Sequence, residues 1–326
     1  MTTATMQAVQ IHRYGGPEEL TLEQAPRPVP QAGEVLLRVY AAGVNPLDWK
    51  IRQGLMQAFQ PITFPYIPGI EGAGVVEEVG PGVAADLVGQ AVIWQTTSGA
   101  YAEYLTVSVE DFARKPKSLS FVEAAAVPVG ATTAWRALFE HGGLISGQRV
   151  LIQGAAGGVG VFAVQLAKWK GAQVIGTAAT ANLDFVRSLG ADTVVDYTTT
   201  PIESVVRDVD LVLDGVGGET LLSSLAALRR GGTLISIAGP PPQEEAQARG
   251  VRALMSRGAA SVPLETLSQL IDESHFTVPA GKTFLLSEVQ QAHSFCQSGH
   301  GRGRIVLRMV EKGGDTKRLP QPGWLF

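Results

Sequence analysis

A glycine-rich turn is the feature of this sequence with the clearest chemistry. It follows an apolar predicted strand over 149–153 and precedes a predicted helix over 159–170. Glycines let a pyrophosphate approach backbone amides closely, and a helix N-terminus offers unpaired N–H groups and a positive dipole end. The residues expected to contact such a group are Ala156, Gly157, Gly158, Val159 and Gly160.

The surroundings of this turn strengthen its interpretation. Strand, turn, helix and a second predicted strand over 173–178 follow one another as in a dinucleotide-binding unit. Ala155 replaces the first glycine of the G-x-G-x-x-G pattern. An ordinary glycine turn that binds nothing is therefore the alternative.

The end of the second strand indicates which dinucleotide would bind. NAD sites usually carry Asp or Glu about 20 residues after the turn, where it holds the ribose hydroxyls. Here the chain has Thr177, Ala178 and Thr180, and the first acid is Asp184. A carboxylate would repel a 2′-phosphate, so its absence favours NADPH, with the two threonine hydroxyls as donors to that phosphate.

The elements around the turn predict an α/β fold. Strands and helices alternate between 149 and 273, which implies a parallel, doubly wound sheet. Its fifth predicted strand, 233–238, ends at Ala238 and Gly239, on the edge where ligands of such sheets bind. Residues 1–115 contain short β-prone runs and predict a barrel or sandwich. A last predicted strand, 303–308, is expected to return to this N-terminal domain, and 311–326 to be coil.

Composition excludes several classes of protein. The 326 residues are 45% hydrophobic and 17% charged, with a net charge of −4, which argues against a nucleic-acid-binding protein. The one cysteine, Cys296, cannot form an internal disulfide. The longest uncharged stretches, 53–70 and 150–167, are interrupted by prolines or glycines, so we expect no membrane association and a soluble, cytoplasmic protein.

Several motifs resemble the medium-chain dehydrogenase/reductase superfamily. They span 33–48, 68–76, 99–104, 126–135 and 155–160, in the family's order. The resemblance implies a GroES-like β-barrel catalytic domain over 1–122, completed by 278–326, and a Rossmann NADPH-binding domain over 123–277. It also implies a cofactor cleft between the domains and a homodimer.

Within that family the chain resembles the zinc-free branch. Zinc-dependent members bind the metal through a cysteine near Asn45 and the histidine of a Gly-His-Glu triplet. This chain has Ile70 in that triplet and no cysteine near Asn45, so we expect no metal. The segment Asn45-Pro-Leu-Asp48 resembles the quinone oxidoreductase branch, which includes zeta-crystallin.

The resemblance also implies roles for single residues. Asn45 and Lys50 are the expected catalytic donors to the substrate. Thr133, Tyr197 and Arg302 are expected to contact the cofactor. The alternatives are a structural turn at Asn45, a solvated side chain at Lys50 and an aromatic residue that merely ends a strand at Tyr197.

Two functions follow from these expectations. The first is an NADPH-dependent reductase that transfers hydride to a quinone or an activated alkene, such as an enone or enal. The second is a non-catalytic NADPH-binding redox sensor or crystallin-like protein.

Overall fold

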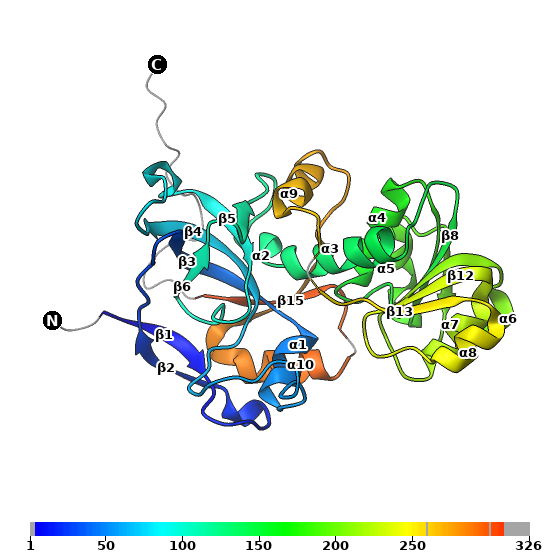
Figure 1. The fold of residues 1–326 in the computed structure, drawn as a ribbon, viewed down its shortest axis with the longest axis horizontal. Helices are drawn as coiled ribbons and strands as arrows, with labels where there is room; N and C mark the ends of the chain where they lie inside the picture. The colour runs from blue at the N-terminus through cyan, green and yellow to red at the C-terminus, as the bar shows by residue number, and fades with distance from the viewer. Residues whose placement is uncertain (1–3, 259, 300, 310–326) are drawn as a thin grey trace, which may run out of the picture.

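One half of the molecule is built on a six-stranded parallel sheet (Figure 1). The computed structural model describes residues 4–258, 260–299 and 301–309. The strand order is β10-β9-β8-β11-β12-β13, so the chain runs outward from β8 and returns to its other side at β11. The strands are β8 (Arg149–Gln153), β9 (Gln173–Ala178), β10 (Thr193–Asp196), β11 (Val209–Asp214), β12 (Leu228–Ser236) and β13 (Arg252–Met255).

Helices cover this sheet. They are α4 (Gly160–Trp169), α5 (Leu183–Ser188), α6 (Ile202–Val205), α7 (Thr220–Ala227) and α8 (Gln243–Arg249). Three of them, α4, α5 and α7, fall where the sequence predicted helices, whereas α6 and α8 were not predicted. Helix α4 is buried from Gly160 through Ala167, which explains why its sequence has no polar face. The predicted doubly wound sheet is confirmed, and its switch point lies between the carboxyl ends of β8 and β11.

The other half is a mainly antiparallel barrel, in which only β14 and β15, among the described strand pairs, run parallel. Its seven-stranded sheet has the order β14-β15-β3-β4-β5-β7, β6 pairs with β3, and β1 and β2 form a separate pair. The bounds are β1 (Thr5–Gln10), β2 (Thr21–Pro26), β3 (Glu34–Val44), β4 (Glu71–Val79), β5 (Ala91–Gln95), β6 (Tyr104–Ser108), β7 (Phe112–Arg114), β14 (Ala280–Leu285) and β15 (Arg304–Arg308). The antiparallel pairing of β15 with β3 confirms that the chain returns to the N-terminal domain.

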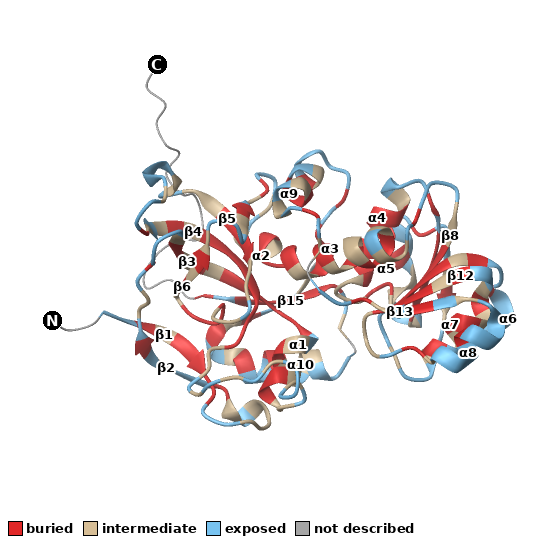
Figure 2. Cartoon of the chain, viewed as in Figure 1, coloured by how far each residue is buried: buried red, intermediate tan, exposed pale blue. Residues whose placement is uncertain are grey.

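Short helices join the two halves or cap the barrel (Figure 1). The largest apolar core runs through α3, α4 and the sheet and also includes barrel residues such as Ala41, Ala73 and Ile93, so the two halves share buried surface (Figure 2). The helices are α1 (Pro46–Arg52), α2 (Phe121–Ala124), α3 (Pro128–Trp135) followed by a π-helical segment (Arg136–His141), α9 (Leu264–Asp272) and α10 (Val289–Gln297). Short 3₁₀ turns are η1 (Pro17–Glu19), η2 (Ala85–Leu87), η4 (Thr180–Asn182) and η5 (Leu286–Glu288).

Two local expectations need correction. Strand β12 ends at Ser236, because the amides of Ala238 and Gly239 turn back to the Ser236 hydroxyl at 3.4 and 3.2 Å. Asn45 begins helix α1 rather than an isolated turn. Across the described ranges, no helix is both long and apolar enough to cross a bilayer.

The burial of β15 in the barrel core predicts that its apolar side chains contribute to the stability of the protein. Leu307 is fully buried, whereas its neighbour Arg308 is exposed. We expect Leu307→Ala to lower the free energy of unfolding by about 2–5 kcal/mol, since it leaves a cavity in a packed core. Chemical denaturation measures this, with Arg308→Ala as control. Equal stability of the two variants would contradict the assignment.

Candidate cofactor and substrate site

The glycine-rich turn lies at the carboxyl end of β8, at the switch point of the sheet. Gly154 has φ +73°, a left-handed conformation that favours glycine. A Cβ on Gly160 would lie 2.2 Å from the Gly154 carbonyl oxygen, so only glycine lets the helix begin this close to the turn. Within the described chain, the amides of Ala156, Gly158 and Val159 have no hydrogen-bond acceptor. The turn therefore offers donors to an anion, as predicted for a pyrophosphate.

A segment near the end of the chain lies against this turn. The Gly303 amide donates to the Ala156 carbonyl at 2.8 Å. The Arg304 Nη1 atom is 3.0 Å from the position that a Cβ on Gly158 would occupy. A guanidinium is thus added to the free amides, although the sequence had pointed to Arg302 rather than Arg304.

Arg304 belongs to a buried polar network in the barrel. Its guanidinium contacts Glu71 and donates from Nη2 to the Asn45 Oδ1 atom at 3.0 Å. The Asn45 Nδ2 atom donates to Glu71 Oε1 at 2.7 Å. The other Glu71 oxygen accepts from the amide of Val129, at the start of α3, at 2.7 Å. The network therefore connects β4, α1, α3 and β15.

Both polar side-chain atoms of the predicted donor Asn45 have partners in this network. The residue is 3% exposed, and its amide nitrogen and oxygen both have buried partners. The arrangement makes Asn45 a bridge between Glu71 and Arg304, and so a residue that can position the guanidinium beside Gly158.

Asp48 is the second buried acid of this region. One carboxylate oxygen accepts from the backbone amide of Asn45 at 2.7 Å and from the Tyr101 hydroxyl at 2.8 Å. The first of these bonds caps helix α1. The other oxygen has no partner among the described residues. Burial raises the pKa of Asp48 to about 7, against the effect of these two hydrogen bonds.

Lys50 is half-buried on α1, with its ammonium 5.6 Å from the centre of the Trp49 ring. No carboxylate or hydrogen-bond partner engages it in the part of the chain that the structure describes. Its charge is therefore available to a ligand, and its ring contact is with Trp49 rather than with the Asn45 network.

The predicted adenosine end of the site lies at the carboxyl end of β9. Thr177 is 1% exposed, accepts from the Gly154 amide at 3.1 Å and donates to Gln153 at 2.9 Å. Ala178 is buried, whereas Thr180 and Tyr197 are exposed. Thr177 thus stabilises the glycine turn through its hydrogen bond with Gly154 and does not face a ligand.

Two further acids, Asp196 and Asp214, lie at this edge of the sheet, and the sequence analysis did not predict either as a site residue. The Thr180 hydroxyl donates to Asp196 at 2.5 Å. Asp214, fully buried at the end of β11, accepts from two amides and two hydroxyls and so holds the loop after it. Ala238 lies against this loop, since a Cβ on Gly217 would be 3.1 Å from the Ala238 Cβ.

The remaining predicted contacts lie on either side of the turn. Arg302 is exposed, with its guanidinium 4.8 Å from the centre of the Phe185 ring on α5. Thr133 is half-buried on α3, whose Gly130 approaches the glycine turn at Gly158. Gly239 is half-buried beside Ala238.

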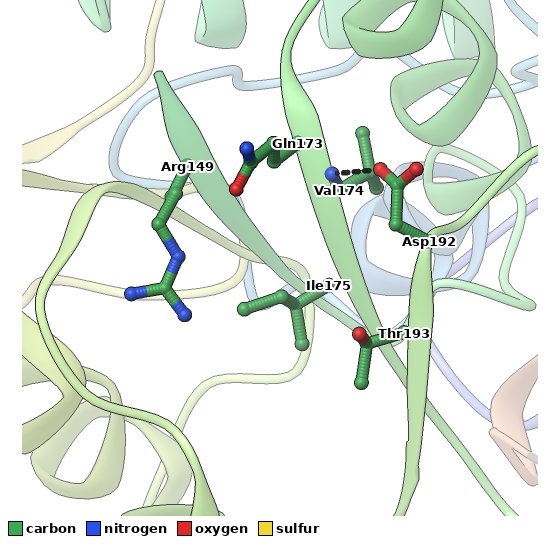
Figure 3. A pocket seen from close by; sticks show the side chains of 6 residues that line it. All are labelled: Arg149, Gln173, Val174, Ile175, Asp192 and Thr193. Carbon is green, nitrogen blue, oxygen red and sulfur yellow. Dashed lines mark hydrogen bonds between the residues drawn. The ribbon is translucent and has the colours of Figure 1, made fainter. Parts of the chain in front are cut away.

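A separate hollow of about 320 Å³ lies on the opposite edge of the same sheet (Figure 3). Its lining comes from the amino ends of β8, β9 and β10, with the Asp192 carboxylate bonded to the Val174 amide at 2.7 Å. Because ligands of parallel sheets bind at the carboxyl ends, this hollow is not the candidate site.

The residues at the family's metal position do not fit zinc. Ile70 is buried and apolar, and Asn45 is occupied by Glu71 and Arg304. Across residues 4–258, 260–299 and 301–309, no group of three or more His, Cys, Asp or Glu side chains is placed to hold a metal ion.

Family models match two parts of the chain. Residues 31–117 match the alcohol dehydrogenase GroES-like domain, and residues 189–307 match a model described as zinc-binding dehydrogenase. A spinach protein named quinone-oxidoreductase homolog, chloroplastic, is 33% identical, over 94% of this chain and 99% of its own. The chain belongs to the medium-chain dehydrogenase/reductase family, among its quinone-oxidoreductase-like members.

Two other relatives extend the comparison. The 2-methylene-furan-3-one reductase of Solanum lycopersicum is 32% identical, over 94% of this chain and 79% of its own. The quinone oxidoreductase structure from Coxiella burnetii superposes with a TM-score of 0.85 at 31% identity, covering 94% and 99% of the two chains. These similarities identify an oxidoreductase and suggest a nicotinamide cofactor.

The raised pKa of Asp48 makes the stability of the protein depend on pH. The folded protein keeps the Asp48 proton up to about pH 7, whereas the unfolded chain releases it near pH 4. Stability should therefore fall as the pH rises through this window. Asp48→Asn removes the titration, so its stability relative to wild type should increase from pH 4 to 7, by on the order of 4 kcal/mol.

Denaturation at several pH values measures this effect. Asp86→Asn, at an exposed acid, is the control and should follow wild type. Parallel pH profiles for wild type and Asp48→Asn would show that Asp48 does not hold its proton.

Proposed function

We propose that the protein is an NADPH-dependent, zinc-independent reductase that transfers hydride to a quinone or an activated alkene. The observation that carries the proposal is the set of unpaired amides at Ala156, Gly158 and Val159, with the Arg304 guanidinium beside them. Free amide donors at a sheet switch point are suited to a dinucleotide pyrophosphate. The names of the spinach and tomato relatives support the two substrate classes.

The proposed division of roles follows the two halves of the molecule. A bound nicotinamide would supply the hydride, and negative charge would then grow on the conjugated oxygen of the acceptor. Lys50, with no carboxylate partner among the described residues, is the proposed charged donor to that oxygen. Asn45 supports the site by holding Arg304 and Glu71 in place. Protonation of the product would come from water.

The preference for NADPH rests on charge at the adenosine end. Strand β9 itself ends in Ala178, without an acid, and the exposed guanidinium of Arg302 lies over the Phe185 ring of α5, while Asp196 of the neighbouring strand β10 carries the opposing charge. Thr133, Tyr197, Ala238 and Gly239 are the other proposed cofactor contacts. A homodimer and a cytoplasmic location remain predictions.

The direct test mixes the purified protein with NADPH and a panel of quinones, enones and enals. Loss of NADPH absorbance with at least one panel member is expected, without added metal and in the presence of a chelator. Binding of NADPH without turnover of any acceptor would favour the non-catalytic alternative, a redox sensor or crystallin-like protein. Activity that disappears with a chelator would overturn zinc independence.

Variants of the two predicted catalytic residues should behave differently. Lys50→Ala should lower kcat by about 10²-fold, the effect of losing one donor to a developing oxyanion, with little change in NADPH affinity. Lys50→Arg should restore part of the activity. Lys117→Ala, at an exposed lysine, is the control for charge. If Lys50→Ala and Lys117→Ala have the same kcat, Lys50 is not a catalytic residue.

Asn45→Ala should weaken NADPH binding and lower the melting temperature together. The change leaves the buried Glu71 and Arg304 side chains each without one hydrogen-bond partner. Cofactor titration beside a melting curve measures both effects. A loss of kcat with unchanged affinity and stability would instead make Asn45 a direct donor to the substrate.

A further inference from the structure

The acid that strand β9 lacks is present on the neighbouring strand. In the parallel pairing of β10 with β9, Asp196 is the register partner of Ala178. Ala178 stands where NAD sites usually carry an acid to hold the ribose. A carboxylate thus reaches the end of β9 from the side, 18 residues later in the chain than Ala178.

Three donors hold the Asp196 carboxylate at this position. The Thr180 hydroxyl donates to one oxygen at 2.5 Å. The Thr198 hydroxyl and amide donate to the other at 2.6 and 2.9 Å. These hydrogen bonds lower the pKa of Asp196, and the bond from Thr180 has the largest effect. The carboxylate is therefore negatively charged at neutral pH.

The same bonds remove the two donors that the sequence had offered to a 2′-phosphate. A threonine hydroxyl has one proton. Thr180 directs its proton to Asp196, and Thr177 directs its proton to Gln153. The Thr180 oxygen keeps acceptor capacity, which suits a ribose hydroxyl rather than a phosphate.

We infer that Asp196 is a specificity-determining residue that opposes the 2′-phosphate of NADPH and gives the site a substantial affinity for NADH. This inference rests on the proposed function. Asp196 and Arg302 then act in opposite directions: the carboxylate repels the phosphate, and the guanidinium over Phe185 attracts it. The ratio of NADPH to NADH affinity follows from the balance of these two charges rather than from the end of β9 alone.

The test is Asp196→Asn, which keeps an acceptor for Thr180 and removes the charge. We expect the dissociation constant for NADPH to fall about ten-fold, while that for NADH stays equal or rises, because removing a charge near a partly exposed dianion changes its binding by this order. Titration of each cofactor into the purified variant measures both constants. The gain should shrink at high salt, since exposed charges are screened.

Two further variants separate charge from other effects. Asp192→Asn removes a carboxylate just before the same strand, at the opposite edge of the sheet, where Lys168 pairs with it at 2.8 Å, and should leave the ratio unchanged. Thr180→Val removes the hydrogen bond but keeps the carboxylate, so it should not increase NADPH affinity. Arg302→Ala should weaken NADPH more than NADH.

The outcomes distinguish the two proposals. If wild type binds both cofactors and Asp196→Asn does not change their ratio, the role of Asp196 is overturned and the reductase proposal stands. An equal gain in Asp192→Asn would also overturn it, because net charge alone would then explain the effect. If wild type binds neither cofactor, the proposed function itself fails.

Discussion

A buried ion pair between Glu71 and Arg304 organises the junction of the two halves. Glu71 is fully buried and Arg304 almost so, and charges at such depth carry a large desolvation cost. Asn45 and the Val129 amide supply the hydrogen bonds that offset part of it. Each partner comes from a different element, so the hydrogen bonds form only when β4, α1, α3 and β15 have their native positions relative to one another.

This constraint explains why a strand from near the end of the chain returns to the barrel. Strand β15 delivers Arg304 beside both Asn45 and the glycine turn. One guanidinium thereby links the barrel to the first turn of the Rossmann half. The two halves are coupled through a polar contact at the site and through the shared apolar core around α3.

The sequence predicted best what depends on neighbouring residues. Strands β8 and β9 have the predicted bounds, and the glycine turn between them has the expected strand–turn–helix order. Helix α1 was missed because Asn45-Pro46 was interpreted as a turn, although Asp48 three residues on is the capping signal. Whether Asn45 faces a ligand or Glu71 depends on residues 26 and 259 positions away, which no local pattern shows.

Cofactor selectivity also depends on contacts between residues that are distant in the sequence. The reading along the chain treated the end of β9 as uncharged, because the next acid in the sequence is Asp184. A parallel sheet, however, places the end of β10 beside the end of β9, and so brings Asp196 next to Thr180. Two of the acids in this region, Glu71 and Asp196, also act in different ways. Glu71 is neutralised by a buried arginine and serves the architecture, whereas Asp196 is held only by neutral donors and keeps its full charge toward solvent and ligand. The charge at the proposed adenosine end is therefore set by two adjacent strands, because uncharged β9 ends beside Asp196 of β10.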